Sequence, residues 1–424
     1  MNQILSLGLP LGKRIVLSGN DGLSLQEPEA EARSPSNLSR APLYVLALLI
    51  LVALLLAPLR GVAAPDQAKG KTPWAMVLCT YPEAGVRGNW QPRDWEALFV
   101  PGTGGLTDYF REVSYGAIDV SGSRVFGWFT LPYAKTEAQR TVDDAIMTTG
   151  NTFLFSNTAN FHDSDAGKLI FVEGAGLKPN TVIVSVRTSA VVELSSAAAS
   201  TVSMVKAKIQ KSREALIEDC AHAAESQVHF PDYYGIIAVR NDAIDADATA
   251  RSPLNLNGVT KTYGKLLLAD WWLNVTHIGH EMLHGYGLEH SRSDMPSKNA
   301  DGTALTYTEY GDPWDIMSAM VVNGFPGTFG MSTAGDTTSG PGMNAANLDL
   351  MGWMPATKRW VWNGIPGSAM LSPLNAPEGA APLVAIVPLG DPLHYYTVEL
   401  RRADHWDQVS QQRGKTSQRY RAEC

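Results

Sequence analysis

The stretch His280-Glu281-Met282-Leu283-His284-Gly285-Tyr286-Gly287-Leu288-Glu289-His290 decides how the rest of this sequence is interpreted. Side chains four residues apart share one face of a helix, so His280 and His284 can direct their imidazoles at one ion while Glu281 lies beside it. Gly287 permits the positive φ of a turn that ends the helix and delivers His290 from another direction. Three imidazole nitrogens leave the fourth position of a tetrahedral zinc open for water, which is the catalytic arrangement.

Chance is a poor explanation for this pattern. An accidental match to the five fixed positions of H-E-x-x-H-x-x-G-x-x-H has a probability on the order of 10⁻⁵ over the whole chain. Four of the nine histidines lie between 277 and 290. The first of them, His277, lies one turn before His280, and we interpret it as a helix cap or a support for the ligands, with no metal role.

A second motif follows at a suitable distance. The segment Tyr310-Gly311-Asp312-Pro313-Trp314-Asp315-Ile316-Met317-Ser318 resembles the Met-turn of metzincins, in which a methionine, here Met317, lies under the zinc site. With both motifs, the chain resembles the secreted metzincin-like peptidases of the gametolysin and immune inhibitor A families. Astacin-like and serralysin-like metzincins add a tyrosine two residues after the methionine, where this chain has Ala319, so the resemblance implies no tyrosine oxyanion helper at that position.

The resemblance covers roughly residues 74 to 405. Residues 108–116 look like the early helix of these families, and Leu350-Met351-Gly352-Trp353 looks like the passage into a β domain. The third ligand is His290, as in gametolysin, and not the aspartate common in immune inhibitor A. The segment 151–203 departs from the families and is rich in Val, Thr and Ser, which indicates an inserted β module.

These features predict an α/β (α+β) fold: a metzincin-like catalytic domain, a small inserted β module and a C-terminal β region. The expected parts are a polar leader at 1–40, a signal peptide or membrane anchor at 41–64, a catalytic domain at 65–150 and 204–360, the module at 151–203, and a partial β domain with a polar tail at 361–424.

The spacing of apolar residues predicts individual strands and helices. Apolar runs predict strands at 74–79, 125–132, 235–240 and 263–270, and helical spacing predicts helices at 106–114 and 204–226. The strand at 263–270 precedes the site helix, and the resemblance implies that it is an edge strand that pairs with an extended substrate.

Composition limits the classes of partner. The 424 residues are 45% hydrophobic, which is ample for a buried core. The formal net charge of -8 and the absence of a dense lysine and arginine stripe argue against a nucleic-acid partner, because phosphate neutralisation needs clustered cations.

Residues 41–59 carry no charge and, as a helix, roughly match a bilayer core. They predict either a signal peptide, cleaved after the small residues Gly61-Val62-Ala63-Ala64, or a retained membrane anchor. Either alternative puts the rest of the chain outside the cytoplasm, secreted or surface-anchored. The protein would contact a membrane only through residues 41–59, and only if they are not cleaved.

Three further features of the sequence each allow two interpretations. Cys79 and Cys220 either pair in an oxidising compartment or stay buried thiols. After the third histidine, oxygen donors either bind Ca²⁺ or form a solvated acidic loop; they are Asp294, Asn299 and Asp301. The polar segment 408–424 indicates either a truncated or frame-shifted end or a disordered tail.

The expected chemistry is hydrolysis of peptide bonds in a protein or peptide substrate. Glu281 takes a proton from a water activated by one zinc ion and passes it to the leaving amine. The alternative is a cell-surface binding or adhesion protein on a peptidase fold, and the intact Glu281 favours the enzyme. Cleavage specificity and oligomeric state stay undetermined.

Overall fold

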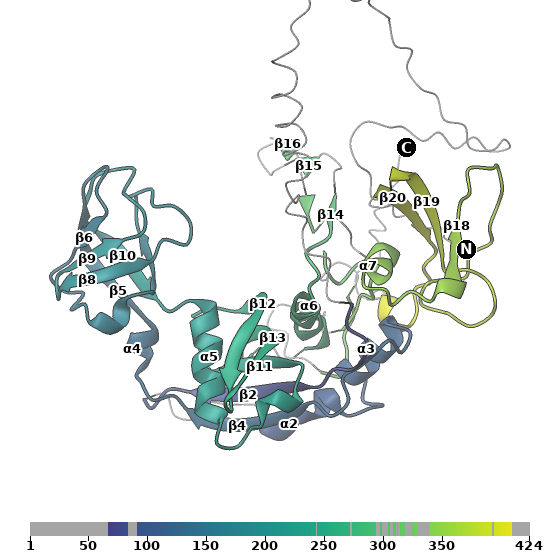
Figure 1. The fold of residues 1–424 in the computed structure, drawn as a ribbon, viewed down its shortest axis with the longest axis horizontal. Coiled ribbons are helices and arrows are strands. Elements are labelled where there is room, and N and C mark those ends of the chain that lie inside the picture. Colours follow the sequence, from purple (N-terminus) through teal and green to yellow (C-terminus); the bar gives the residue numbers. More distant parts are fainter. Residues whose placement is uncertain are drawn as a thin grey trace, which may run out of the picture.

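The structure, a computed structural model, describes residues 67–83, 91–242, 244–271, 274–293, 297–298, 304–305, 308–310, 312, 314–318, 324–329, 339–391 and 394–408. Over these residues the protein is mixed α/β, with several sheets and few helices, which agrees with the predicted α+β class. Figure 1 shows a β module, a central sheet with its helices, and a smaller C-terminal β region next to one another.

A five-stranded sheet forms the centre of the molecule. In spatial order its strands are β12 (Asp247–Leu256), β13 (Val259–Ala269), β11 (Gly235–Arg240), β2 (Trp74–Thr80) and β4 (Arg124–Thr130). All neighbours are parallel except β12, which is antiparallel to β13. The strands predicted at 74–79, 125–132 and 235–240 are confirmed. The prediction that 263–270 is an edge strand is wrong, because β13 is hydrogen-bonded on both sides and β12 takes the edge.

Helices cover both faces of this sheet, as the side chains of β2 show. The even-numbered side chains of β2 enter a core shared with α3 (Leu106–Val113) and α6 (Val275–Gly285). The odd-numbered side chains, from Ala75 to Cys79, enter a second core on the opposite face, under α5 (Arg213–Ala224). A parallel strand buried on both faces has a continuous apolar sequence, and β2 has one.

Trp74, at the start of β2, fills a space that three glycines leave open. A Cβ atom at Gly235, Gly264 or Gly285 would lie 2.4, 2.7 or 2.5 Å from the Trp74 ring. The indole Nε1 donates a hydrogen bond to the Tyr286 hydroxyl at 3.1 Å, which fixes the ring. β11, β13 and α6 can therefore all approach one side chain, because each supplies a residue without a Cβ.

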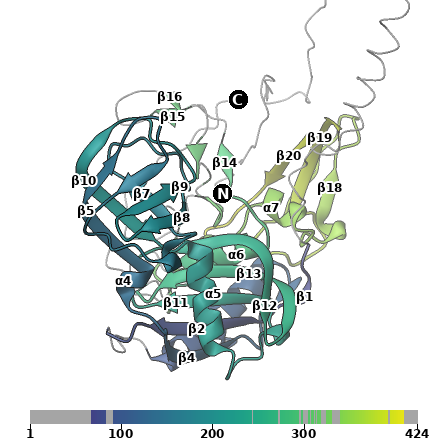
Figure 2. The ribbon, with the colours of Figure 1, turned by 60° about the vertical axis from the view of Figure 1, so that its left-hand side comes forward.

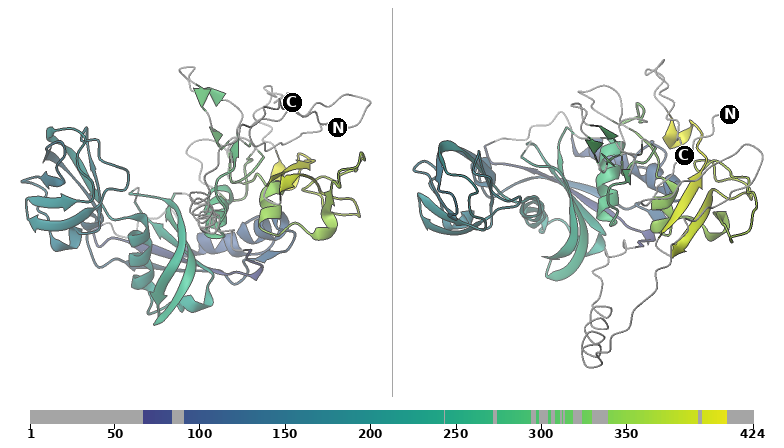
Figure 3. Two further views of the ribbon diagram at one scale, coloured as in Figure 1. Left: turned by 45° about the horizontal axis from the view of Figure 1, so that its top comes forward. Right: turned by 90° about the horizontal axis from the view of Figure 1, so that it is seen from above.

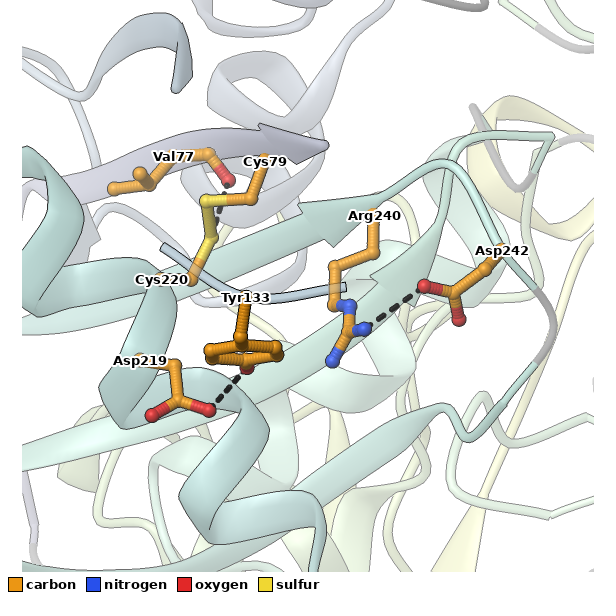
Figure 4. The surroundings of a disulfide bond; sticks show 7 residues. All are labelled: Val77, Cys79, Tyr133, Asp219, Cys220, Arg240 and Asp242. Atoms are coloured by element: carbon orange, nitrogen blue, oxygen red, sulfur yellow. Dashed lines mark hydrogen bonds and ion pairs between the residues drawn. A yellow bond between two sulfur atoms is a disulfide. The ribbon is translucent and has the colours of Figure 1, made fainter. Parts of the chain in front are cut away.

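A disulfide joins Cys79 of β2 to Cys220 of α5, 141 residues further along the chain (Figure 4). Both cysteines are completely buried, so the bridge fastens the helix to the sheet inside the core. The structure thus decides the alternative between a bridge and two thiols. Close to the disulfide, the buried Arg240 donates a hydrogen bond to Asp242 at 2.9 Å.

Residues 139–210 form a six-stranded sheet with a core of its own. In spatial order its strands are β7 (Leu169–Val172), β10 (Val202–Gln210), β5 (Gln139–Met147), β6 (Phe153–Phe155), β9 (Val191–Leu194) and β8 (Ile183–Thr188). Figures 1 and 3 show this module to one side of the central sheet, and Figure 2 brings it forward. It extends beyond the predicted segment 151–203 at both ends.

The helix predicted over 204–226 is wrong in its first part. Residues 202–210 form β10, in which the alternate side chains Ala207 and Ile209 fill the core of the module. The helix α5 begins at Arg213, after the N-cap Ser212. Pairing of β10 with β5 and β7, which lie earlier in the chain, overrides the helical spacing of this segment.

The two ends of the module lie next to each other. β5 and β10 are antiparallel neighbours, and beyond them the amide of Lys211 donates a hydrogen bond to the carbonyl oxygen of Ala138 at 2.8 Å. The chain therefore leaves the central domain and returns to it at almost the same place.

Inside the module, the carboxylate of Asp165 is completely buried. It accepts hydrogen bonds from Arg140 Nη1 at 2.9 Å and from Lys168 Nζ at 2.7 Å. Burial alone would raise the pKa of Asp165, but these two cations outweigh it and hold the pKa at about 2. The charged cluster therefore ties the start of β5 to the loop before β7.

The C-terminal β region is a three-stranded sheet of β18 (Arg359–Val361), β19 (Val384–Asp391) and β20 (His394–Glu399). After it, Trp406 lies edge-on to Tyr109 of α3, with ring centroids 5.0 Å apart. Several apolar side chains of this region belong to the same core as the site helix, so it packs on the central domain.

The remaining elements are short. They are β1 (Gly70–Lys71), α2 (Pro92–Glu96), η1 (Ala97–Phe99), β3 (Ile118–Asp119), α4 (Lys135–Ala138), η2 (Asp163–Asp165), η3 (Phe230–Asp232), β14 (Arg292–Ser293), β15 (Ser297–Lys298), β16 (Ala304–Leu305), β17 (Thr308–Glu309), α7 (Ala345–Leu350), η4 (Ala356–Lys358) and η5 (His405–Asp407).

Several predicted features lie outside the described residues. They are the leader and hydrophobic segment at 1–64, the tail from 409 onward, and Asp294, Asn299, Asp301 and Ala319. In the part of the chain that the structure describes, no helix combines the length and the apolarity needed to cross a membrane.

Candidate metal centre

Helix α6 carries the first two predicted ligands. It begins after the N-cap Asn274, whose side-chain oxygen accepts a hydrogen bond from the amide of His277 at 2.7 Å. This cap satisfies one of the amides that the first turn of a helix leaves without a partner. Ile278 and Met282 are completely buried in the core, which fixes how the helix lies against the sheet.

The turn after α6 brings in the third ligand. The helix ends at Gly285, and Gly287 has a φ of 95°, as the sequence predicted. The amide of Leu288 donates back to the carbonyl oxygen of Leu283 at 3.1 Å, so the chain folds against its own helix. His290 then faces the two helix histidines instead of continuing away from them.

The three predicted ligands converge on one point. Nε2 of His284 lies 3.2 Å from Nε2 of His280 and 2.9 Å from Nε2 of His290, and the third separation is 3.2 Å. These separations are compatible with an ion about 2.0–2.1 Å from each nitrogen, which is the usual Zn–N distance.

Hydrogen bonds from the other ring nitrogen, Nδ1, orient the imidazoles of His280 and His284. Nδ1 of His280 donates to the carbonyl oxygen of Ile316 at 2.6 Å, and Nδ1 of His284 donates to that of Leu288 at 2.7 Å. With the proton on Nδ1, each Nε2 keeps its lone pair for a metal. Burial lowers the pKa of His280 to about 3 and also lowers that of His284, so both rings are neutral at pH 7.

The donor set fits a metal ion on chemical grounds. Three lone pairs directed at one another within 3.2 Å repel unless a positive charge lies between them. Neutral imidazole nitrogens suit divalent transition metals, zinc among them. His280, His284 and His290 are the residues that would hold such an ion.

Met317 lies in the segment that supports this centre. It is completely buried, and its carbonyl oxygen accepts a hydrogen bond from the amide of Ser291 at 2.8 Å. Its neighbour Ile316 receives the hydrogen bond from His280. This short turn thus bonds to the first ligand, His280, and to Ser291, the residue that follows the third ligand, His290.

Asp315, next to this turn, is a supporting residue that the sequence did not single out. Its buried carboxylate accepts hydrogen bonds from Ser291 Oγ and from Asn347 Nδ2, the latter at 2.8 Å. Burial raises the pKa of Asp315 to about 7. The carboxylate links the loop of the third ligand to α7.

Glu281 lies beside the histidine cluster with its carboxylate almost completely buried. Oε2 accepts a hydrogen bond from the amide of Ala248, on β12, at 2.6 Å. Burial first, and the nearby Asp247 carboxylate second, raise the pKa of Glu281 to about 8. A carboxyl group with a raised pKa next to a metal-binding cluster is typical of an acid–base catalyst.

Tyr310 is a site residue that the sequence analysis missed. Its hydroxyl lies 3.2 Å from Nε2 of His290, and the two ring centroids are 4.5 Å apart. The tyrosine position that the resemblance offered lies two residues after Met317 and is Ala319 in this chain. Tyr310 comes from the start of the Met-turn segment instead, and its place at that motif was the available signal.

These side chains line one cavity of about 610 Å³. The first residues of β12, from Asp247 to Ala250, form another part of its wall, together with Arg213 of α5. The outermost strand of the central sheet therefore begins at the candidate metal centre. This edge could not be assigned from local sequence, because it depends on strand order.

No family model matches this chain, and no curated protein is significantly similar to it.

Proposed function

We propose that this protein is an exported zinc-dependent endopeptidase of the metzincin type, with Glu281 as the general base. The observation that carries this proposal is the convergence of three Nε2 atoms within 3.2 Å of one another, beside a buried carboxylate. The supporting turn at Met317 and the resemblance of the two motifs to those of metzincins point to the same class.

The chemistry divides between the ion and the protein. A zinc ion held by the three histidines would supply a water with a pKa lowered toward 7 and would polarise the scissile carbonyl. Glu281 accepts the proton of the attacking water at its carboxylate and delivers it to the leaving amine. The hydrogen bond from Ala248 fixes the direction of that carboxylate.

Tyr310 has a position suited to a second role. Its side chain lines the same cavity as His290, with the hydroxyl 3.2 Å from Nε2 of that ring, so it can donate a hydrogen bond to the carbonyl oxygen that gains negative charge during attack. A donor of this kind stabilises the transition state more than the substrate, which raises kcat.

β12 provides a surface for an extended peptide. It is the outermost strand of the central sheet, and residues 248–250 line the cavity beside Glu281. The amide and the carbonyl oxygen of Ala248 already bond to Glu281 and Arg213, so the main chain of a substrate would add as a further strand through the backbone beyond Ala248. Such pairing would bring a peptide bond to the metal centre independently of its side chains, which suits an endopeptidase.

The test is hydrolysis of casein by the purified protein, with and without a chelator, and with zinc content measured in parallel. Glu281→Gln keeps the size of the side chain and should lower the rate by about 10² or more, the usual contribution of a general base. It should leave bound zinc unchanged. His284→Ala should remove both zinc and activity.

The control variant is His222→Ala, which removes an exposed histidine on α5. It should retain both zinc and activity. Cleavage that survives the chelator, or Glu281→Gln with wild-type activity, would refute the proposal. Retention of zinc without any cleavage would favour the binding or adhesion alternative.

A further inference from the structure

A second group of metal-binding side chains lies in the same cavity. Asp247, His277 and Glu281 each offer one donor atom, and these atoms all lie within 4.8 Å of one another. None of the three is a ligand in the histidine cluster described above. The group combines one imidazole with two carboxylates, which is a donor set that divalent cations such as zinc accept.

The arrangement follows from two elements. His277 and Glu281 are four residues apart on α6, so they share one face of the helix, with Nε2 and Oε1 3.8 Å apart. Asp247 comes from the first position of β12, where its φ of 91° is an unusual value for a residue with a side chain. The donors thus approach one space from two directions.

The charges favour a cation in this space. Asp247 and Glu281 bring two carboxyl groups within 4.8 Å of each other, and two carboxylates at that distance repel unless a cation lies between them. Oε2 of Glu281 is occupied by the amide of Ala248, whereas Oε1 accepts no hydrogen bond from the described residues. Oε1 lies 3.8 Å from Nε2 of His277, so it is the oxygen of Glu281 that would share a cation with that ring.

Arg213 does not block the space. It lies 3.2 Å from Asp247, but it also bonds to Asp245 at 2.9 Å and to the carbonyl oxygen of Ala248 at 2.8 Å. Arg213 therefore keeps two partners if Asp247 turns toward a cation. The side chain of Asp247 is half exposed, which leaves space for that turn.

We propose that Asp247, His277 and Glu281 form a second site for a divalent cation of the zinc class, and that its occupation inhibits the enzyme. The inhibition rests on the proposed function, since a cation bound to Glu281 takes the lone pair that must accept the proton of the attacking water. Binding at the site itself does not depend on that function.

The second site is the weaker of the two. A tetrahedral zinc holds its donors about 3.3 Å apart, so donors spread over 4.8 Å must close around the ion. The three histidine nitrogens are already within 3.2 Å of one another. Zinc therefore fills the histidine site first, and the second site responds to zinc in excess.

The experiment measures bound zinc and casein hydrolysis in the full chain, at free zinc just sufficient for the first site and at a large excess. In excess zinc the wild type should bind a second equivalent and lose activity by about 10² at saturation, the typical contribution of a general base. His277→Leu and Asp247→Asn should each lose the second equivalent. Activity is compared between the two zinc levels within each variant, so that a change in basal rate does not matter.

The matched control is His222→Ala, which removes an exposed histidine that lies 2.8 Å from a carboxylate of Glu225. It should keep the second equivalent, which separates this site from adventitious surface binding. A second equivalent that persists in His277→Leu and in Asp247→Asn would overturn the proposal, and so would a wild type that binds one zinc at all levels. If the second equivalent depends on His277 and Asp247 but no variant cleaves casein, the cation site stands and the proposed peptidase function fails.

Discussion

Substitution of Gly285 by alanine tests the packing that positions the site helix. An added Cβ would lie 2.5 Å from Cη2 of Trp74, well inside contact distance. Trp74 is completely buried and is held by its hydrogen bond to Tyr286, so the ring cannot move away. The helix must shift instead.

The expected cost follows from two opposing effects. Overpacking of a well-packed core costs about 1–3 kcal/mol. Alanine gains at most about 1 kcal/mol of helix propensity over glycine, and less at the last residue of a helix. Gly285→Ala should therefore lower the free energy of unfolding by about 1–2 kcal/mol. Because His284 is the preceding residue, zinc affinity should fall as well.

The matched control is Gly279→Ala on the same helix. Its Cβ would lie 3.3 Å from Cδ1 of Ile316, the end of a flexible side chain, and 3.6 Å from the Tyr109 ring, an ordinary contact, so the change should be neutral or slightly stabilising. Urea unfolding of both variants gives the comparison, and chelator competition gives the zinc affinity. Combining Gly285→Ala with Trp74→Phe should recover part of the loss, since the smaller ring relieves the contact. Equal stability of Gly285→Ala and Gly279→Ala would refute the reasoning.

Three further predictions concern other parts of the molecule. Tyr310→Phe should lower kcat of casein hydrolysis by about 10²–10³ with little change in zinc content, as loss of one oxyanion donor does; an unchanged kcat would exclude the role. The pKa of Asp165, about 2, lies below its usual value, so its stabilisation is complete above pH 4 and is lost as the pH falls toward 2. Hydrogen exchange in β7 and β10 should show this loss in the wild type and, in Asp165→Asn, weaker protection already at pH 7. Replacing Cys79 and Cys220 by alanine should destabilise the protein by about 2–4 kcal/mol in urea unfolding, and no shift would contradict the structural role of the bridge.

The histidine cluster could be predicted from sequence because its geometry is local. The four-residue spacing of His280 and His284 follows from the helix, and the turn follows from Gly287, whose φ of 95° agrees with the prediction. The apolar run of β2 also sufficed, since a strand buried on both faces has an almost continuous apolar sequence. In these cases neighbours in the sequence determine the structure.

Features that depend on distant partners could not be predicted in this way. The edge of the sheet is β12 and not β13, because strand order is set by pairing between segments far apart in the chain. The segment from Met204 to Gln210 becomes a strand because β5, some sixty residues earlier, is available as its neighbour. Tyr310 reaches His290 through a loop, which no periodicity describes.

The hydrogen bond between Lys211 and Ala138 has a consequence for how such a protein can change over time. The chain enters the module after Ala138 and leaves it before Lys211, and these two residues are joined by a hydrogen bond of 2.8 Å. A direct link between them would therefore leave the strands of the central sheet unchanged. The module, with its separate core, could thus be lost, replaced or acquired as a unit while the histidine cluster stays intact. The surface residues of the module can therefore change in evolution at a different rate from the residues of the histidine cluster.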